Sequence, residues 1–179
     1  MKTIQKLCCG IAIAAISLPL MANPPLKVGD AAPLVSGFDQ DGNRWSLAEQ
    51  VGKSMVLLYF YPKYNSPGCT TEACSIRDKM ADFKQAGVEV VGVSFDDKDS
   101  HKDFMFKYNL DFPLLTDTNG AISDAYGARM AADRKLDRRV TFLIGLNGKI
   151  LHITDAPDPS VHLKELAAAL ADAITKLTQ

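Results

Sequence analysis

Two short apolar segments constrain the fold of this chain more than any other feature of its sequence. They are residues 55–61 (MVLLYFY) and the nearly continuous run at residues 88–95 (VEVVGVSF). Runs of this length without polar alternation are typical of strands buried on both faces in the interior of a mostly parallel sheet. Residues 67–86 between them read as a helix, and Gly87 is a typical residue just past a helix end. The pattern therefore predicts an α/β layer architecture.

The remaining segments add a hairpin at each end of this unit. Asp41-Gly42 and Asn147-Gly148 are turn dipeptides that favour antiparallel hairpins. The other predicted elements are strands at 34–38 and 43–45, a helix at 100–109 with Ser100 and Asp103 at capping-box spacing, a short helix at 121–126, strands at 140–144 and 149–154, and an amphipathic helix at 161–177. This order predicts a mixed sheet flanked by helices, which is the thioredoxin-like fold with an N-terminal β-hairpin extension.

The first 22 residues differ in composition from the rest. Lys2 and Lys6 precede an uncharged stretch, residues 7–20 (LCCGIAIAAISLPL), and the small residue Ala22 follows. This pattern predicts a secretory signal peptide at residues 1–22, cleaved near Ala22, and a single domain at residues 23–179. Fourteen apolar residues are fewer than the roughly 20 that span a bilayer, so we expect a periplasmic or secreted protein without stable membrane association.

Charge and cysteine content narrow the function classes. The chain of 179 residues has 20 basic and 21 acidic residues that are mixed along it, so there is no basic stripe for nucleic acid. Cleavage of the leader would remove Cys8 and Cys9 and leave Cys69 and Cys74. Two cysteines in an oxidising compartment usually form a disulfide, and the question is whether that disulfide is structural.

Cys69 lies where a helix is predicted to begin. Ser66 is the expected N-cap, and Pro67 suits the first helical position because its missing N–H costs nothing there. Unpaired N–H groups and the positive end of the helix dipole stabilise a thiolate in the first turn. Cys69 is therefore placed to act as a nucleophile.

The spacing of the two cysteines argues against a permanent structural disulfide. Five helical residues turn through about 500° and rise about 7.5 Å, which places the two Cα atoms roughly 8.7 Å apart. A disulfide requires about 7 Å or less, so an intact helix would have to unwind before the bond formed. Unwinding this segment costs little free energy, because it contains four weak helix formers: Gly68, Thr70, Thr71 and Ser75. This favours a redox switch, although a static disulfide in a short loop remains an alternative.

A metal site is a further alternative, with less support. The three histidines, His101, His152 and His162, show no spacing to each other or to the cysteines that implies ligation. Each reads as a surface or packed histidine, and neither a metal nor a cofactor is expected.

Three segments resemble a known family. Residues 59–74 (YFYPKYNSPGCTTEAC) are similar to the peroxidatic segment of the peroxiredoxins, and most closely of the peroxiredoxin Q group, also called bacterioferritin comigratory protein. Pro62, Ser66 and Cys69 meet the family pattern P-x-x-x-T/S-x-x-C. Residues 139–144 (RVTFLI) resemble the strand that carries the family's arginine, and residues 100–117 resemble its middle segment.

The resemblance implies a role for each matched residue. Cys69 would be the peroxidatic cysteine and Cys74 the resolving cysteine within the same helix. Arg139 would supply a fixed positive charge, Ser66 a hydroxyl that orients the peroxide, and Pro62 a shield against bulk water. The sequence departs from the family pattern in having Ser66 where threonine is commoner, and in a short, basic segment at residues 127–138.

The resemblance also implies a reaction. A thiol peroxidase would reduce hydrogen peroxide or organic hydroperoxides, form a Cys69–Cys74 disulfide and be reduced again by a thioredoxin-like donor. An intramolecular resolving cysteine favours a monomer. Two alternatives stay open: an exported thiol-disulfide oxidoreductase acting on proteins, which usually carries C-x-x-C rather than the C-x-x-x-x-C found here, and a non-enzymatic redox-sensing or metal-carrying module.

Overall fold

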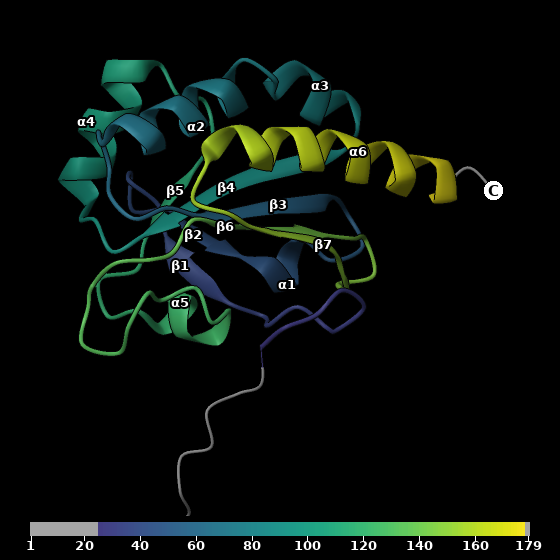
Figure 1. Ribbon diagram of the computed structural model, residues 1–179, viewed down its shortest axis with the longest axis horizontal. Coiled ribbons are helices and arrows are strands. Elements are labelled where there is room, and N and C mark those ends of the chain that lie inside the picture. Colours follow the sequence, from purple (N-terminus) through teal and green to yellow (C-terminus); the bar gives the residue numbers. More distant parts are fainter. Residues whose placement is uncertain (1–24, 178–179) are drawn as a thin grey trace, which may run out of the picture.

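A five-stranded mixed sheet forms the centre of the computed structural model, which describes residues 25–177 of the chain (Figure 1). Its strands, in spatial order, are β5 (Leu114–Thr116), β4 (Val88–Ser94), β3 (Met55–Phe60), β6 (Val140–Ile144) and β7 (Ile150–Asp155). β3 and β4 are parallel, as are β4 and β5, whereas β6 is antiparallel to both β3 and β7. The predicted mixed sheet is confirmed. The predicted leader at residues 1–22 lies outside the described residues.

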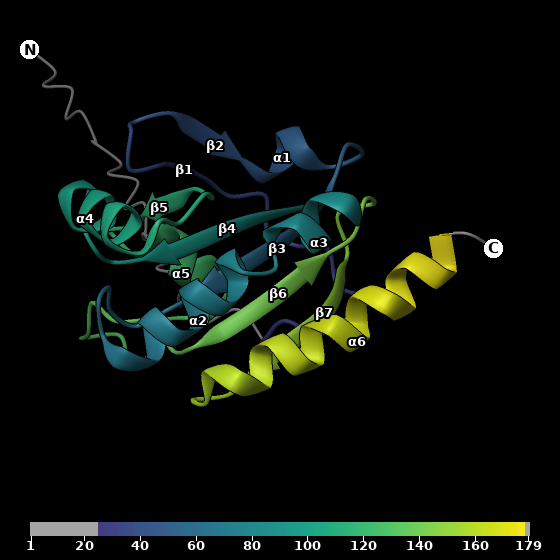
Figure 2. The same ribbon diagram turned by 90° about the horizontal axis from the view of Figure 1, so that it is seen from above.

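The two faces of the sheet are covered differently. The helices α2 (Pro67–Arg77), α3 (Met80–Gln85), α4 (Lys98–Tyr108) and α6 (Pro159–Leu177) lie on one side. The hairpin of β1 (Ser36–Phe38) and β2 (Arg44–Ser46) and the short helices α1 (Leu47–Gln50) and α5 (Ala121–Ala125) lie on the other. Seen from above, α2 and α6 lie side by side, with α6 along the edge of the sheet at β7 (Figure 2), and the two helices make direct contact. This contact joins α2 to a helix about 90 residues later in the chain.

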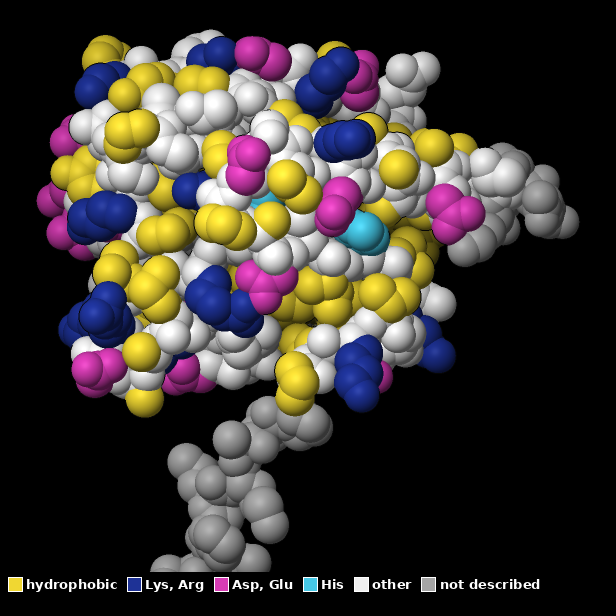
Figure 3. Space-filling view, in the orientation of Figure 1, with side chains coloured by type: hydrophobic (Ala, Val, Ile, Leu, Met, Phe, Trp, Pro, Cys, Tyr) yellow, Lys and Arg dark blue, Asp and Glu magenta, His cyan; other side chains and the backbone are white. Residues whose placement is uncertain are grey.

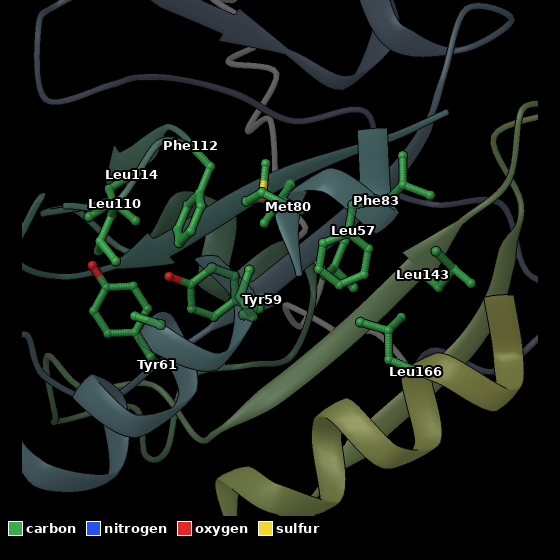
Figure 4. Close-up of a cluster of buried hydrophobic side chains, with 14 of the residues drawn as sticks. Leu57, Tyr59, Tyr61, Met80, Phe83, Leu110, Phe112, Leu114, Leu143 and Leu166 are labelled. Atoms are coloured by element: carbon green, nitrogen blue, oxygen red, sulfur yellow. The ribbon is translucent and has the colours of Figure 1, made fainter. Parts of the chain in front are cut away.

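The position of β3 inside the sheet explains why its sequence is apolar throughout. Alternate residues of a strand point to opposite faces. Leu57 and Tyr59 enter the cluster beneath the helices, where Figure 4 shows them among Phe83, Leu143 and other buried side chains, while Leu58 enters the opposite cluster. All six residues of the strand are buried. A strand covered on both faces has no position left for a polar side chain, as the continuous apolar run predicts.

The predicted turns are present. Gly42 has φ of +85° between β1 and β2, and Gly148 has φ of +72° between β6 and β7. Gly87 has φ of +69° directly before β4. L-residues with a side chain rarely adopt these angles, so the glycines determine where the chain reverses.

Two predictions about helices are wrong. The single helix expected at residues 67–86 is divided at Asp78 and Lys79 into α2 and α3. Nothing in the local sequence marks the break; tertiary contacts stabilise it, since the Arg77 guanidinium, at the end of α2, donates to the carbonyl of Tyr108 on α4. The capping box at Ser100 is also wrong. The helix begins earlier, at Lys98, because Asp97 is the N-cap and its carboxylate accepts from the Ser100 N–H at 2.9 Å.

The sequence reading also missed β5 and α1. Each is only three or four residues long, so neither has enough length to show a periodic pattern.

Acidic and basic side chains are interspersed on the face shown in Figure 3, with apolar side chains between them. Within residues 25–177, none of the helices is both long enough and apolar enough to cross a membrane.

Candidate active site

Cys69 lies in the first turn of α2, at the end of the sheet where β3 leads into the helix. Pro67 is the first helical residue, as predicted, and the first helical hydrogen bond is donated by the Thr70 N–H to the Ser66 carbonyl at 2.8 Å. The N–H groups of Gly68 and Cys69 therefore lie ahead of the helical ladder, where the helix dipole is positive. The Cys69 side chain is buried, with the residue 1% exposed, and its thiol is free.

Arg139 holds its guanidinium against this sulfur. The residue directly precedes β6, and its side chain donates from Nη2 to Cys69 Sγ at 3.4 Å, from Nη1 to the Glu72 carboxylate and from Nε to the Pro157 carbonyl at 3.1 Å. Each of its three nitrogens thus has a separate acceptor. This arrangement fixes both the position and the plane of the group, as a lysine ammonium could not.

Glu72 is the carboxylate in this cluster. It lies one helical turn after Cys69 and is fully buried. Burial raises the pKa of Glu72 to about 7, although the charge and hydrogen bond of Arg139 act in the opposite direction. The site therefore contains a cation that both a thiolate and a carboxylate can share, and the carboxylate changes its charge near neutral pH.

The approach of Arg139 to the helix depends on Gly68. A Cβ atom at this position would lie 2.9 Å from Arg139 Nη2. We expect Gly68→Ala to displace the guanidinium and reduce the second-order rate constant with hydrogen peroxide about tenfold, because small misplacements of a positioning group are costly. The free energy of unfolding should not fall in parallel, since alanine is the better helix former. Stopped-flow kinetics and urea unfolding measure the two effects.

Ser75→Ala, a small substitution later in α2, is the matched control and should leave both quantities near those of the unsubstituted protein. Equal peroxide rate constants for Gly68→Ala and the control would contradict this account of Gly68.

The loop between β3 and α2 is held by two neighbouring elements. Asp96, two residues after the end of β4 and 4% exposed, accepts from the Tyr64 N–H at 2.7 Å and from the Lys63 ammonium. Asn65 has φ of +53°, and its side-chain oxygen accepts from Lys107 Nζ at 2.9 Å and Tyr108 Oη at 2.7 Å, both on α4. The loop is therefore anchored at its strained residue and at the two residues before it.

The structure also shows where the other predicted site residues lie. Ser66 is the N-cap residue by position, but its hydroxyl does not cap the helix; it donates to the Lys63 carbonyl at 2.9 Å. Pro62 is half-buried in the same loop, directly after the buried Tyr61. Both residues belong to the loop that leads to Cys69.

Cys74 lies in the same continuous helix as Cys69, and both thiols are free. Its side chain is half-buried and interacts with Arg77, on the predicted side of the helix away from the core. Cys69, by contrast, packs among Ala73, Ile76 and Phe83, as the helical pattern predicted. The two cysteines therefore occupy different environments in this reduced, helical state.

Two buried polar residues of this region were not predicted from the sequence as site residues. Glu72 lies between Cys69 and Ile76 on the buried face of α2, and His162 begins the buried face that Leu166 and Leu170 continue on α6. A charged or titratable residue at helical spacing within an apolar stripe was the available signal, because such a group needs a partner when buried.

Within residues 25–177, no three His, Cys, Asp or Glu side chains gather as ligands for a metal ion.

Residues 28–153 match the model of the AhpC/TSA family. The chain belongs to the AhpC/TSA family. It is 41% identical over 143 residues to peroxiredoxin Bcp of Escherichia coli (strain K12), covering 77% of this chain and 91% of that protein. It is 40% identical over 138 residues to the chloroplastic peroxiredoxin Q of Oryza sativa subsp. japonica, covering 76% and 63% of the two chains.

Solved structures agree with the sequence relatives. Peroxidoxin BcpB from Mycobacterium tuberculosis superposes with a TM-score of 0.77 at 30% identity, covering 82% of this chain and 97% of that one. The bacterioferritin comigratory protein of Xanthomonas campestris, whose structures were solved to examine alkyl peroxide reduction, gives 0.72 at 28% identity, covering 81% and 99%. The thioredoxin-like peroxiredoxin fold and the predicted resemblance to the peroxiredoxin Q group are confirmed. The chain is thus a peroxiredoxin, a thiol-dependent peroxidase.

Proposed function

We propose that this peroxiredoxin reduces hydrogen peroxide and organic hydroperoxides at Cys69, with Cys74 as its resolving cysteine. The observation that carries the proposal is the 3.4 Å contact between Arg139 Nη2 and Cys69 Sγ at the start of α2. The guanidinium and the free N–H groups of the helix start favour a thiolate at Cys69. The same donors face the place where negative charge develops on the departing oxygen.

In the first step the Cys69 thiolate attacks the terminal oxygen of the hydroperoxide. A sulfur–oxygen bond forms, the oxygen–oxygen bond breaks, and the alkoxide or hydroxide leaves and takes up a proton. Ser66 supports this step as an acceptor: its hydroxyl hydrogen is already donated to the Lys63 carbonyl, so its oxygen is free to accept from the peroxide O–H. Pro62 limits the access of bulk water. The product at Cys69 is a sulfenic acid.

In the second step the Cys74 thiolate attacks the Cys69 sulfur, a disulfide forms, and the hydroxyl group leaves as water after taking up a proton. The start of α2 must unwind for the two sulfurs to meet, since helical cysteines at this spacing are too far apart. Unwinding breaks the Cys69–Arg139 contact and strains the anchors of the loop at Asp96 and Asn65. Disulfide formation is therefore coupled to a local change of structure.

Mass spectrometry tests the disulfide directly. One equivalent of hydrogen peroxide should lower the mass of the reduced protein by about two hydrogens, and peptide mapping should find Cys69 joined to Cys74. A product that joins two chains through Cys69, or that retains a free Cys74 beside a persistent sulfenic acid, would contradict the proposal. Size-exclusion chromatography before and after oxidation should give a monomer, because no second chain is needed.

The reductant is proposed to be a thioredoxin-like dithiol protein, which would exchange with the Cys69–Cys74 disulfide and leave with its own cysteines oxidised. Continuous peroxide consumption should require that protein together with its reductase. Efficient reduction of insulin without peroxide consumption would instead support the alternative of a protein disulfide oxidoreductase.

We also propose that residues 1–22 direct export and are removed near Ala22, on the basis of their charge and apolar pattern. The family match begins at residue 28, after this segment. Cell fractionation followed by N-terminal sequencing tests the proposal. A cytoplasmic protein that retains Lys2 and Lys6 would contradict it.

A further inference from the structure

His162 connects the last helix of the chain to the cluster around Cys69. The residue is 3% exposed. Its ring Nε2 lies 2.8 Å from the Ala156 carbonyl and its Nδ1 lies 2.7 Å from Thr141 Oγ1. Nδ1 also lies 3.6 Å from Glu72 Oε1. The ring therefore lies between β6, α2 and the segment that precedes α6, all of which meet at the cysteine site.

The partners of the ring define where its hydrogens can be. A carbonyl oxygen only accepts, so Nε2 carries a hydrogen whatever the charge of the ring. In the neutral ring Nδ1 then has a lone pair, which accepts from the Thr141 hydroxyl. Neutral His162 thus has no hydrogen to offer to Glu72.

Glu72 has a buried oxygen that lacks a hydrogen-bond donor. Its Oε2 accepts from Arg139, whereas Oε1 is buried and has no hydrogen-bond partner among the described residues. An ionised carboxylate oxygen in such a place is costly. One additional proton, on Glu72 Oε1 or on His162 Nδ1, would allow the two groups to form a hydrogen bond to each other.

We propose that His162 is a positioning residue for the peroxidatic step: with Glu72 it holds one buried proton, and this proton leaves the charge of Arg139 available to the Cys69 thiolate. The inference rests on the peroxidatic role proposed for Cys69. When the proton is present, the Glu72–His162 pair is neutral, and the thiolate and Arg139 balance each other. When it is lost, a second buried anion competes for the same guanidinium.

The charged surroundings decide where the proton resides. Glu72 interacts with Arg139 and with the buried phenol of Tyr59, and Cys69 interacts with the same two groups. Besides Glu72, His162 is influenced by Arg139 and by the carboxylates of Glu165 and Asp155. Burial raises the pKa of Glu72 to about 7 and lowers the pKa of His162, so the proton resides on the carboxyl group at acidic pH and is lost as the pH rises through about 7.

Two substitutions of His162 should both move the Glu72 titration to lower pH, by different amounts. The amide of His162→Gln can donate to Glu72 Oε1 but cannot hold the proton; it favours the ionised carboxylate and should move the Glu72 titration to lower pH. The ring of His162→Phe offers no acceptor to the protonated carboxyl group, so the protonated form loses its hydrogen bond and the titration should move to lower pH by a smaller amount. We expect displacements of about half a pH unit or more in each case, which is a modest change for a buried carboxyl group.

The experiment records the second-order rate constant of each reduced protein with hydrogen peroxide from pH 5.5 to 8.5, together with the infrared band of the protonated carboxyl group. The unsubstituted protein should show an inflection near pH 7 that is missing in Glu72→Gln. His152→Phe, a partly exposed histidine on β7, is the matched control and should superimpose on the unsubstituted protein.

Profiles of the His162 variants that coincide with the unsubstituted protein, or that move to higher pH, would overturn the inference. So would the absence of any inflection near pH 7 in the unsubstituted protein. If His162→Phe fails to fold, the downward displacement in His162→Gln still decides the question. Failure of the proposed function looks different: Cys69→Ser would remain active, whereas here all proteins react and only their pH profiles are compared.

Discussion

Cys69→Ser is expected to lose at least about 10⁴-fold in peroxide reduction, the largest effect of any substitution in this chain. A serine hydroxyl at this position stays protonated near neutral pH, so the helix start and Arg139 have no anion to stabilise. Cys74 remains in the variant but contacts Arg77 on the other side of the helix. Stopped-flow measurement with hydrogen peroxide at pH 7 checks the result.

Cys74→Ser is the matched control, because it makes the same change of atom in the same helix. This variant should consume one equivalent of peroxide at an undiminished rate and then stop, with a sulfenic acid at Cys69 that a dimedone reagent traps. Steady turnover by Cys69→Ser, or no first turnover by Cys74→Ser, would reverse the roles assigned to the two cysteines.

Arg139→Lys is expected to lower the rate constant with peroxide by about 10²-fold to 10³-fold, the usual effect of removing one donor from a site of developing charge. The guanidinium has three acceptors in three directions, Cys69 Sγ, the Glu72 carboxylate and the Pro157 carbonyl, and an ammonium cannot reach all of them. The lysine variant keeps the positive charge but cannot make the three hydrogen bonds that fix the position of the guanidinium.

Arg139→Met removes the charge as well and should also reduce stability, by about 1 kcal/mol more at pH 8 than at pH 6, because it leaves the buried Glu72 carboxylate without a cation. The loss depends on pH in a defined direction. The folded-state pKa of Glu72 is already raised to about 7 and should rise further without Arg139. The penalty added by the variant is therefore absent below the folded-state pKa of the unsubstituted protein, grows as the pH rises above about 7, and is complete only above the higher folded-state pKa of the variant. Urea midpoints from pH 5 to pH 8 measure this trend.

Arg138 supplies the matched control for both variants of Arg139. It is the adjacent residue, but its side chain is partly exposed and binds Asp155 and the Gly127 carbonyl on the outer surface. Arg138→Lys and Arg138→Met should change neither the peroxide rate constant nor its pH profile. Equal losses at the two positions would mean that general positive charge, rather than the position of one guanidinium, promotes the reaction.

The pH dependence of the intact protein follows from the same cluster. Glu72 ionises as the pH rises through about 7, and its negative charge then competes with Cys69 for Arg139. The buried carboxyl group of Asp137 is separate from this site. Asp137, whose pKa burial also raises to about 7, shares a hydroxyl with Asp117 through Ser123, and is not among the charges that influence Glu72.

Local sequence was sufficient where a single turn or helix start determines the structure. Pro67 at the first helical position, Gly42 and Gly148 in the hairpins and the apolar run of β3 were all identified correctly, because each constrains only its immediate neighbours in the chain. The apolar face of α2 that carries Cys69 follows in the same way from the helical repeat. These features need no knowledge of what packs against them.

The break between α2 and α3 was missed for the opposite reason. Neither glycine nor proline marks residues 78 and 79, and the end of α2 is stabilised by a contact between Arg77 and the carbonyl of Tyr108, 31 residues away. The strand β5 depends on its pairing with β4, and three residues carry too little pattern to predict it.

The sequence alone determined which atom can act as the nucleophile, because a cysteine two residues after a helix-starting proline meets the positive end of the helix in any fold. It also determined the separation of the two cysteines, since five residues of helix have a set length. The family resemblance pointed to Arg139, but only the tertiary structure decided that Glu72 and His162 join it beside the sulfur. Arg139 directly precedes β6, Glu72 lies on α2 and His162 on α6, and a buried charge is stable only beside partners that distant parts of the chain bring to it.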